Sequence, residues 1–357
     1  MIDILLTYPY LIGLLSFVIG LIFMPVVVKI AQKQHFVVRP NKRMCHVGAI
    51  PNIGGIDICV AFLFIYLLFA YHQFEQSQFF LVGIFMIVVV GFIDDILILS
   101  PKSKLLGEII AGSALICFAD IRITHLHQIF GISEISLIPS YLLSMLILLT
   151  VINAINLIDG VDGLASGLGI LYCLFFAFWF ALAGETIWAI LAIGMIGALA
   201  VFFCYNVFGK KHKIFMGDSG SLLLGYLLTA FTFQFCEMNA YQQAPINLCM
   251  KTAPAVVICV LSVPLFDMIR VSITRIKQHH SPFLADKNHV HHLLLHLGLS
   301  HIQTTCVLLS VTIFFIGFAI IGRNWNFWLL LGSDFVLCTL FTLFLWKLIN
   351  RHDYAQH

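Results

Sequence analysis

Long apolar runs, separated by short polar segments, dominate the chain. A helix needs about 20 apolar residues to cross the hydrocarbon core of a bilayer. We predict eleven spanning helices, over residues 5–28, 53–71, 79–98, 105–120, 138–156, 164–183, 186–205, 219–236, 252–272, 303–321 and 326–347. The first run has no basic flank or small-residue cleavage site, so we expect it to be retained rather than removed as a signal peptide. The pattern predicts an all-α, polytopic membrane helix bundle.

The basic residues predict how the bundle is oriented. An odd number of spans places the two termini on opposite sides of the membrane. All of the 19 Lys and Arg residues except Arg122, Lys251 and Arg323 fall in alternate segments that share one side. Because cytoplasmic segments carry the excess of Lys and Arg, we expect the N-terminus outside and the C-terminus inside. The cytoplasmic loops are then 29–52, 94–104, 153–165, 206–218 and 273–302.

Composition supports the membrane interpretation. Of the 357 residues, 61% are hydrophobic and 10% are charged, whereas soluble domains carry about 25% charged residues. The ten Cys residues include no CxxC pair, which argues against a disulfide framework and against a zinc site of that spacing. We find no internal repeat and no separate soluble domain, so residues 1–357 are interpreted as one membrane-embedded domain. The outer segment 120–138 alternates polar and apolar residues and predicts a short hairpin.

Unusual polar residues gather in five segments that this orientation places on one side. These segments are RPNKRMCHVGAIPNIGG (39–55), GFIDDILILSPKSK (91–104), INAINLIDGVDGLA (152–165), NVFGKKHKIFMGDSGS (206–221) and HHSPFLADKNHVHHLLLHLG (279–298). Ionisable groups beside a span are costly unless they are paired, hydrated or bound to a cation, and they indicate function. We therefore expect a single site at the cytoplasmic membrane surface.

Asp94 and Asp95 are adjacent at the predicted end of a span. Two neighbouring carboxylates repel each other unless a cation or a proton lies between them. Such a pair suits Mg²⁺ binding or general-base catalysis. The alternative is a helix that simply ends near water.

The segment 152–165 repeats one spacing twice. Asn153 and Asn156 are three residues apart, as are Asp159 and Asp162, so each pair would share a helix face. The glycines at positions 160 and 163 instead favour an irregular loop whose backbone approaches a ligand closely. Alternatively, the amides and carboxylates bridge helices inside the bundle.

Asp218 lies between glycines at the predicted start of a span. Backbone N–H groups at a helix start suit phosphate oxygens, and the carboxylate suits a metal. The alternative is ordinary N-capping, which is compatible with both roles.

His289, His291 and His292 form the run HVHH. One interpretation is a zinc site, but no Cys or second His pair at ligand spacing accompanies them. Basic residues surround the run, so we favour a cationic, hydrogen-bonding pocket for phosphate. Carboxylates for a divalent metal, cations for phosphates and a membrane location together indicate phosphoryl transfer.

These motifs, in this order and spacing over about residues 35–300, resemble the polyprenyl-phosphate N-acetylhexosamine-1-phosphate transferases. The loops at 39–55 and 279–298 resemble the WecA/TagO-like branch, which is related to MraY. MraY-type loops end in three His followed by Phe-Glu, which this chain lacks.

The resemblance implies a reaction and its partners. N-acetylhexosamine-1-phosphate passes from a UDP-N-acetylhexosamine to undecaprenyl phosphate and UMP leaves, with Mg²⁺ or Mn²⁺ as cofactor. UDP-GlcNAc is the favoured donor, followed by UDP-GalNAc or a 6-deoxy-HexNAc nucleotide. The reaction would be the first membrane step of an O-antigen, common-antigen or teichoic-acid type of polysaccharide. The expected location is the bacterial cytoplasmic (inner) membrane with the active site facing the cytoplasm. No nucleic acid is expected as a partner, and a homodimer is left open.

The resemblance also implies roles for individual residues. Asp94 and Asp95 match the family's DD pair, which deprotonates the lipid phosphate or organises the metal region. A phosphate monoester has a second pKa near 6, so a dedicated base is optional. Asp218 matches the principal Mg²⁺ ligand, Asn156 a second ligand, and Lys104 a lysine that meets the pyrophosphate.

Further residues match the substrate-binding positions. Phe215 matches an aromatic that packs on uracil. Polar residues expected to line the nucleotide site, the two aspartates also being candidate catalytic residues, are Asn153, Asp159, Asp162 and Asn206. Arg43 and His46 are expected near the lipid phosphate. His289, His291 and His292 are expected to hold the phosphates and the amino sugar. Asp267 and Arg270 have the spacing of an ion pair at a helix end.

Two other classes of protein fit the sequence less well. Transporters place polar sites near the bilayer midplane on broken helices, whereas these motifs cluster at one face. The MGD at 216–218 is similar to the signature of intramembrane aspartyl proteases, but Phe215 stands where their first glycine would be. No HExxH motif is present either.

Overall fold

The computed structural model describes residues 9–34, 37–38, 50–73, 76–209, 212–243, 245–246, 248–278 and 288–356. The α-helices in these ranges are α2 (Pro9–Lys33), α3 (Gly54–Ile65), α4 (Ser77–Leu97), α5 (Pro101–Ser113), α6 (Leu137–Ile158), α7 (Leu164–Ala183), α8 (Thr186–Phe208), α9 (Gly217–Ala240), α10 (Ala253–Val260), α11 (Ser262–Lys277), α12 (Val290–His296), α13 (His301–Gly322) and α14 (Phe327–Gln356). The π-helical turns η1 (Tyr66–Ala70) and η2 (Ala114–Phe118) continue α3 and α5. The prediction of an all-α bundle is confirmed.

Each of the eleven predicted spans coincides with a helix or a helix pair. By length and apolar composition, eight helices of the described chain are able to cross a membrane. The number is nine if α10 and α11, which meet at an angle of 78°, form one broken span. The segments 53–71 and 105–120 form shorter helices, because π-helical turns end α3 and α5 after 12 and 13 residues. A count of eleven spans stays a prediction.

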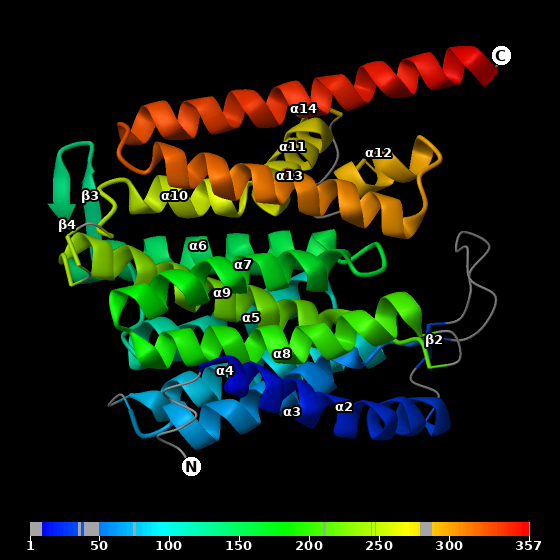
Figure 1. Cartoon of the computed structure of the whole chain (residues 1–357), viewed down its shortest axis with the longest axis horizontal. Coiled ribbons are helices and arrows are strands. Elements are labelled where there is room, and N and C mark those ends of the chain that lie inside the picture. The colour runs from blue at the N-terminus through cyan, green and yellow to red at the C-terminus, as the bar shows by residue number, and fades with distance from the viewer. Residues whose placement is uncertain are drawn as a thin grey trace.

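Polar loops and a hairpin lie at opposite ends of the bundle (Figure 1). The predicted outer hairpin is present as β3 (His125–Ile129) and β4 (Ile132–Glu134), which pair antiparallel. A second small antiparallel pair, β1 (Val37–Val38) with β2 (Ile50–Pro51), lies at the other end, as does α12. This end also holds the turns between α6 and α7 and between α8 and α9, so the described parts of the polar motifs lie at one end of the bundle.

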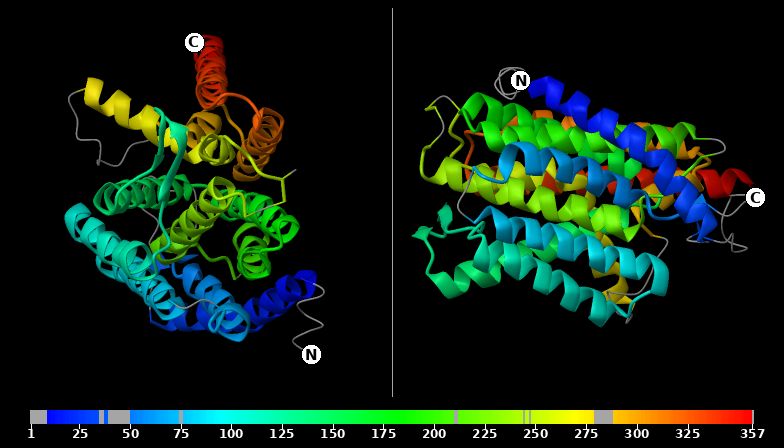
Figure 2. Two further views of the ribbon diagram at one scale, coloured as in Figure 1. Left: turned by 90° about the vertical axis from the view of Figure 1, so that its left-hand side faces the viewer. Right: turned by 90° about the horizontal axis from the view of Figure 1, so that it is seen from below.

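Helix α9 forms the centre of the bundle, and the other helices surround it (Figure 2). In its most apolar 18-residue window, 94% of the residues are buried, against 33% for α4. Glycines let its neighbours approach closely. A Cβ at Gly91 of α4 would lie 2.5 Å from the Cα of Ser219, and a Cβ at Gly225 would lie 2.6 Å from the Cα of Ile152 in α6. The polar start of α9 is therefore held between neighbouring helices.

Candidate active site

A carboxylate from α4 caps the first turn of α9. Oδ1 of Asp95 accepts hydrogen bonds from the backbone N–H of Asp218 at 2.7 Å and from Nδ2 of Asn52 at 3.0 Å. Oδ2 accepts hydrogen bonds from the N–H and the Oγ of Ser219 at 3.1 and 3.0 Å. Free N–H groups and the helix dipole both favour a negative charge at this position. Met216 is the N-cap residue and its side chain makes no cap bond, so the alternative that Asp218 caps its own helix is wrong.

Gly217 is required for this contact. Its φ is +71°, a conformation that side chains disfavour. A Cβ at this position would also lie 2.6 Å from Oδ2 of Asp95. The glycine before Asp218 thus allows the carboxylate of one helix to reach the start of another.

The ammonium group of Lys104 lies among three oxygen-bearing side chains. Its Nζ is 3.1 Å from Oδ2 of Asp94 and 3.1 Å from Oδ1 of Asn156, and it pairs with Oδ2 of Asp218. Asp94 and Lys104 come from α4 and α5, while Asn156 comes from the end of α6. Four helices therefore supply one cluster of opposite charges, which we call the lysine–carboxylate cluster: Asp94, Lys104, Asn156 and Asp218.

The Asn156 amide connects α6 to α9. Its Nδ2 donates hydrogen bonds to Oδ1 of Asp218 at 2.9 Å and to Oγ of Ser221 at 2.8 Å. With the amide nitrogen so engaged, the carbonyl Oδ1 points toward the ammonium group of Lys104. One oxygen of Asn156 and one of Asp218 thus face the same cation.

These donors fit a magnesium ion that is completed by substrate. Mg²⁺ usually takes one or two protein carboxylates and fills its octahedron with phosphate oxygens and water. Asp218 and Asn156, with Asp94 beside them, offer oxygens of this kind, and Mn²⁺ accepts the same donors. Within the described chain no three His, Cys, Asp or Glu side chains gather as a metal site. The residues therefore suit a hard cation shared with a phosphate better than a zinc site made by protein alone.

The turn between α6 and α7 carries Asp159 and Asp162 in irregular backbone, as its glycines predicted. Burial raises the pKa of Asp159 to about 7, and the nearby charges of Asp218, Asp95 and Asp162 add to the effect. Among the described residues the Asp159 carboxylate has no hydrogen-bond or ion-pair partner. The carboxylate of Asp159 lies close enough to Asp218 in the lysine–carboxylate cluster for the two negative charges to repel each other.

Asp162 belongs to a second group of charges. Its Oδ2 is 2.6 Å from Nζ of Lys213 and 3.1 Å from Nδ1 of His301. Burial alone would raise the pKa of Asp162, but the hydrogen bonds from His301 and Lys213 outweigh it and hold the pKa below its usual value. Nζ of Lys213 also lies 5.8 Å from the ring centre of Phe215, within cation–π range.

Asn206 supports the backbone of both adjoining turns. Its Oδ1 accepts a hydrogen bond from the N–H of Gly163 at 2.6 Å, and its Nδ2 donates to the carbonyl of Ile214 at 2.8 Å. Only 4% of its surface is exposed, so Asn206 is a buried residue that connects the two turns through hydrogen bonds to their backbones. Phe215 is fixed in a similar way, since its N–H donates to the carbonyl of Pro51 at 2.8 Å.

Asn153 bridges two helices. Its Nδ2 donates hydrogen bonds to Oε2 of Glu108 in α5 at 2.8 Å and to the carbonyl of Leu149 at 2.9 Å. The structure therefore favours the helix-bridging alternative for Asn153 over direct contact with a substrate.

Asp267 anchors the histidine run. Its Oδ2 lies 2.8 Å from Nδ1 of His289, and its Oδ1 accepts hydrogen bonds from the N–H of Val290 at 2.9 Å and from Arg270 at 2.7 Å. The predicted pair of Asp267 with Arg270 is confirmed. Because His289 is 4% exposed and held in this pair, it orients α12 from the N-cap position.

His291 packs against the turn between α6 and α7. A Cβ at Gly160 would lie 2.5 Å from Nε2 of His291, so the glycine makes room for this ring. Burial lowers the pKa of His291 to about 3, and the neighbouring His292 contributes. The ring is neutral, so its expected contact with phosphate would be a hydrogen bond rather than a charge. The ring centres of His291 and His292 are 4.2 Å apart, so the two rings are neighbours.

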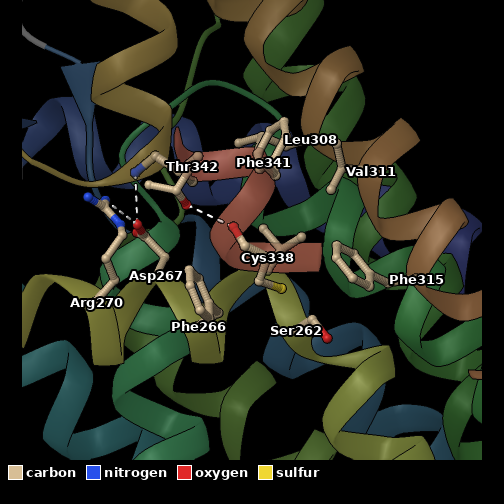
Figure 3. Close-up of a pocket in the computed structure, with 12 residues that line it drawn as sticks. Ser262, Phe266, Asp267, Arg270, Leu308, Val311, Phe315, Cys338, Phe341 and Thr342 are labelled. Atoms are coloured by element: carbon tan, nitrogen blue, oxygen red, sulfur yellow. Dashed lines mark hydrogen bonds and ion pairs between the residues drawn. The ribbon is translucent and has the colours of Figure 1, made fainter. Parts of the chain in front are cut away.

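A pocket lies behind the histidine run, between α11, α13 and α14. Figure 3 shows Asp267 and Arg270 at one end of it and Phe315 at the other. Most of its lining is apolar, and no residue of the lysine–carboxylate cluster lines it. It is a neighbour of the histidine run rather than part of the charged site.

The structure brings most of the predicted site residues to one end of the bundle. Asp94, Asp95, Lys104, Asn156 and Asp218 meet at the start of α9, and Asp159 adjoins them. Asp162 and Phe215 lie on the turns around this point, Asn206 lies at the end of α8, and His291 lies on α12, which His289 precedes as the N-cap residue. Arg43 and His46 lie outside the described residues.

Several contributors were not predicted from the sequence. They are Asn52, Glu108, Lys213, Ser219, Ser221 and His301. A contact of Glu108 with the site could have been predicted, because it follows Lys104 by four residues on one helix. Asn52 and His301 had none, because only the packing of distant segments brings them to the site.

Comparison with known proteins agrees with the geometry. Residues 77–235 match the family model described as glycosyl transferase family 4. An undecaprenyl-phosphate alpha-N-acetylglucosaminyl 1-phosphate transferase from Pasteurella multocida (strain Pm70) is 33% identical over 331 residues, which cover 88% of this chain and 87% of the relative.

Two further relatives carry the same name. The protein from Yersinia pestis is 29% identical over 333 residues, covering 92% of this chain and 87% of the relative. The protein from Escherichia coli (strain K12) is 28% identical over 283 residues, which cover 77% of this chain and 73% of the relative. With its apolar helix bundle and its lysine–carboxylate cluster, the chain belongs to glycosyl transferase family 4, in the group of the undecaprenyl-phosphate N-acetylglucosaminyl 1-phosphate transferases.

Proposed function

We propose that this chain transfers GlcNAc-1-phosphate from UDP-GlcNAc to undecaprenyl phosphate and releases UMP. The observation that carries the proposal is the lysine–carboxylate cluster at one end of a membrane-spanning bundle. Such a place is reached by a water-soluble nucleotide from one side and by a lipid phosphate from the bilayer. The relatives named above support the choice of GlcNAc as the sugar.

The proposed reaction forms one phosphorus–oxygen bond and breaks another. An oxygen of the lipid phosphate attacks the phosphorus that carries the sugar, and the bond from that phosphorus to the bridging oxygen breaks. The electron pair of the broken bond leaves with UMP. Such a step depends mainly on in-line positioning and on neutralising negative charge.

Asp218 and Asn156 are the proposed ligands of a Mg²⁺ or Mn²⁺ ion. When bound, the ion would neutralise phosphate oxygens and the developing charge on the leaving group. Lys104 would add a second positive charge beside the pyrophosphate. In the absence of the ion, Asp94 pairs with Lys104 at 3.1 Å.

Asp95 is proposed to position the first turn of α9 rather than to contact the substrate. Both of its oxygens are occupied by donors at the start of α9, so it is poorly placed to accept a proton from the substrate. Because the second pKa of a phosphate monoester is near 6, the lipid phosphate is mostly a dianion at pH 7. The proposed mechanism therefore needs no dedicated base.

The turns beside the cluster are proposed to hold the nucleotide. Phe215 would pack on uracil, and the pair of Lys213 with Asp162 would fix the loop that carries it. His291 and His292 would contact the phosphates and the amino sugar. Arg43 and His46, in the loop before β2, are proposed to meet the lipid phosphate.

We propose that the enzyme lies in the bacterial cytoplasmic membrane, with its N-terminus outside and its active site facing the cytoplasm. The distribution of Lys and Arg supports this orientation. The reaction would begin the synthesis of a cell-envelope polysaccharide of the O-antigen, common-antigen or teichoic-acid type. The proposal holds for a monomer and for a homodimer alike.

A panel of donors tests the proposal. Membranes containing the chain are incubated with undecaprenyl phosphate, Mg²⁺ and one of UDP-GlcNAc, UDP-GalNAc or UDP-glucose, and the lipid products are weighed by mass spectrometry. We expect a lipid diphosphate carrying N-acetylhexosamine from UDP-GlcNAc, with stoichiometric UMP. Membranes without the chain are the control. Release of UMP without a lipid product, or a product from UDP-glucose alone, would contradict the proposal.

A further inference from the structure

Lys104 occupies the place that a divalent cation would need. Its ammonium group contacts oxygens of Asp94, Asn156 and Asp218, of which the last two are the proposed metal ligands. Its side chain is 16% exposed, so little water reaches the contact. In this arrangement the lysine supplies the positive charge that the carboxylates require.

An ammonium group and a divalent cation cannot both lie between these oxygens. Mg²⁺ binds oxygen at about 2.0–2.1 Å in a nearly ideal octahedron. The ammonium nitrogen already lies within hydrogen-bond distance of the same atoms, and the two positive charges repel each other. Entry of the metal therefore requires the side chain of Lys104 to move.

A second partner for the ammonium group stands one helical turn away. Glu108 follows Lys104 by four residues on α5, a spacing at which side chains meet. Its Oε2 accepts the hydrogen bond from Asn153, whereas its Oε1 is buried and has no hydrogen-bond partner in the described part of the chain. Helical side chains lean toward the N-terminus, which directs this carboxylate toward the turn that carries Lys104.

We propose that Lys104 is a built-in counter-ion that a divalent cation displaces, and that Oε1 of Glu108 receives its ammonium group. Glu108 is then a positioning residue that acts through Lys104. The inference rests on the proposed metal site. It adds to that proposal that a cation binds weakly in the absence of substrate, because the cation has to displace the ammonium group of Lys104.

Binding of Mn²⁺ tests the displacement without any catalytic turnover. The full chain in lipid nanodiscs, free of nucleotide and lipid phosphate, is titrated with Mn²⁺, and the free ion is measured by electron paramagnetic resonance. We expect Lys104→Met to tighten Mn²⁺ binding by roughly tenfold, a usual size for coupling between competing ligands. Lys102→Met, an exposed lysine on the same helix, is the matched control and should leave the Kd within about twofold of wild type.

Glu108→Gln tests the second position. Glutamine keeps an oxygen for Asn153 and removes the negative charge that would receive the ammonium group. We expect Mn²⁺ binding to weaken about threefold in the wild-type background and to change far less in Lys104→Met, because the effect passes through the lysine. An equal effect in both backgrounds would overturn the role of Glu108.

The possible failures are distinguishable. If Lys104→Met binds Mn²⁺ no tighter than wild type, the displacement is wrong, while the donor-panel experiment still decides the proposed function. If neither protein binds Mn²⁺, the proposed metal site is wrong as well. If Lys102→Met tightens binding as much as Lys104→Met, the effect is a general one of charge and the inference fails.

Discussion

Asp95 on α4 closes the N-terminus of α9 by accepting the backbone N–H of Asp218 at 2.7 Å. The residue next to it, Asp94, instead pairs with Lys104 at 3.1 Å. Two adjacent carboxylates with one sequence signature thus have different tasks. Asp95 places the start of a helix, and Asp94 balances the charge of a lysine.

This division predicts that the two aspartates affect stability differently. Asp95→Ala removes the cap of α9, and loss of a helix cap costs about 0.5–2 kcal/mol. Asp94→Ala leaves Lys104 its contacts with Asp218 and Asn156 and removes one accepted hydrogen bond, from the N–H of Leu99 at 2.6 Å, against four for Asp95→Ala, so we expect a smaller loss. The measurement is the thermal unfolding midpoint of both variants in the same detergent. An equal or larger loss for Asp94→Ala would contradict the assignment of the cap to Asp95.

Gly217→Ala should disrupt the contact between Asp95 and the first turn of α9, this time by a change in α9. The new Cβ would meet the carboxylate of Asp95 in a backbone conformation with φ +71°. We expect a large loss of folded protein, measured by size-exclusion chromatography after mild heating. Gly332→Ala is the matched control, because a Cβ at this position near the start of α14 meets nothing within 4 Å. Equal tolerance of both substitutions would show that the close approach at Gly217 is unimportant.

The proposed metal predicts a defined dependence on divalent cations. EDTA should stop transfer, and Mg²⁺ or Mn²⁺ should restore it. Asp218→Asn should lower the transfer rate by roughly 100-fold or more, since a lost metal contact is worth several kcal/mol. Asp120→Asn, at the hairpin end of the bundle, is the control and should keep normal activity. Transfer that persists in EDTA, or in Asp218→Asn, would remove the metal from the mechanism.

The contact of Gly160 with His291 predicts a non-additive pair of substitutions. Gly160→Ala should displace the imidazole ring, because its Cβ would lie 2.5 Å from Nε2 of His291. We expect a raised KM for UDP-GlcNAc from Gly160→Ala and from His291→Ala alone. In the double variant Gly160→Ala should add little, because the ring that it displaces is gone. Fully additive effects on KM would show that the two residues act independently.

The raised pKa of Asp159 predicts that the stability of the fold depends on pH. Its pKa is raised to about 7 in the folded chain, while an unfolded Asp titrates near 3.9. Between these values the folded state holds a proton that the unfolded state has released, so stability falls as the pH rises from about 4 to about 7. In EDTA, Asp159→Asn should therefore show a smaller fall of the thermal midpoint between pH 5 and pH 8 than the wild type. Parallel curves for the two proteins would contradict the buried position of this carboxyl group.

The apolar pattern alone was enough to predict most of the fold. Runs of about 20 apolar residues must form helices in a bilayer, because no water is present there to satisfy the backbone. The positions of the eleven apolar helical segments follow from this rule, and the alternation of polar and apolar residues over 120–138 predicted the hairpin. The sequence also predicted that the polar motifs meet at one end, since alternate loops of a bundle share a side.

The division of labour inside the site depended on tertiary structure. Asp94 and Asp95 look equivalent in the sequence, and only the packing of α4 against α9 makes one a cap and the other a partner of Lys104. Asn153 and Asn156 have the same spacing and the same chemistry, yet one faces Glu108 and the other faces Asp218. The physical reason is that hydrogen bonds reach about 3 Å, whereas a sequence pattern specifies only which face of a helix a residue occupies. Which distant side chain lies opposite that face is decided by how the helices pack.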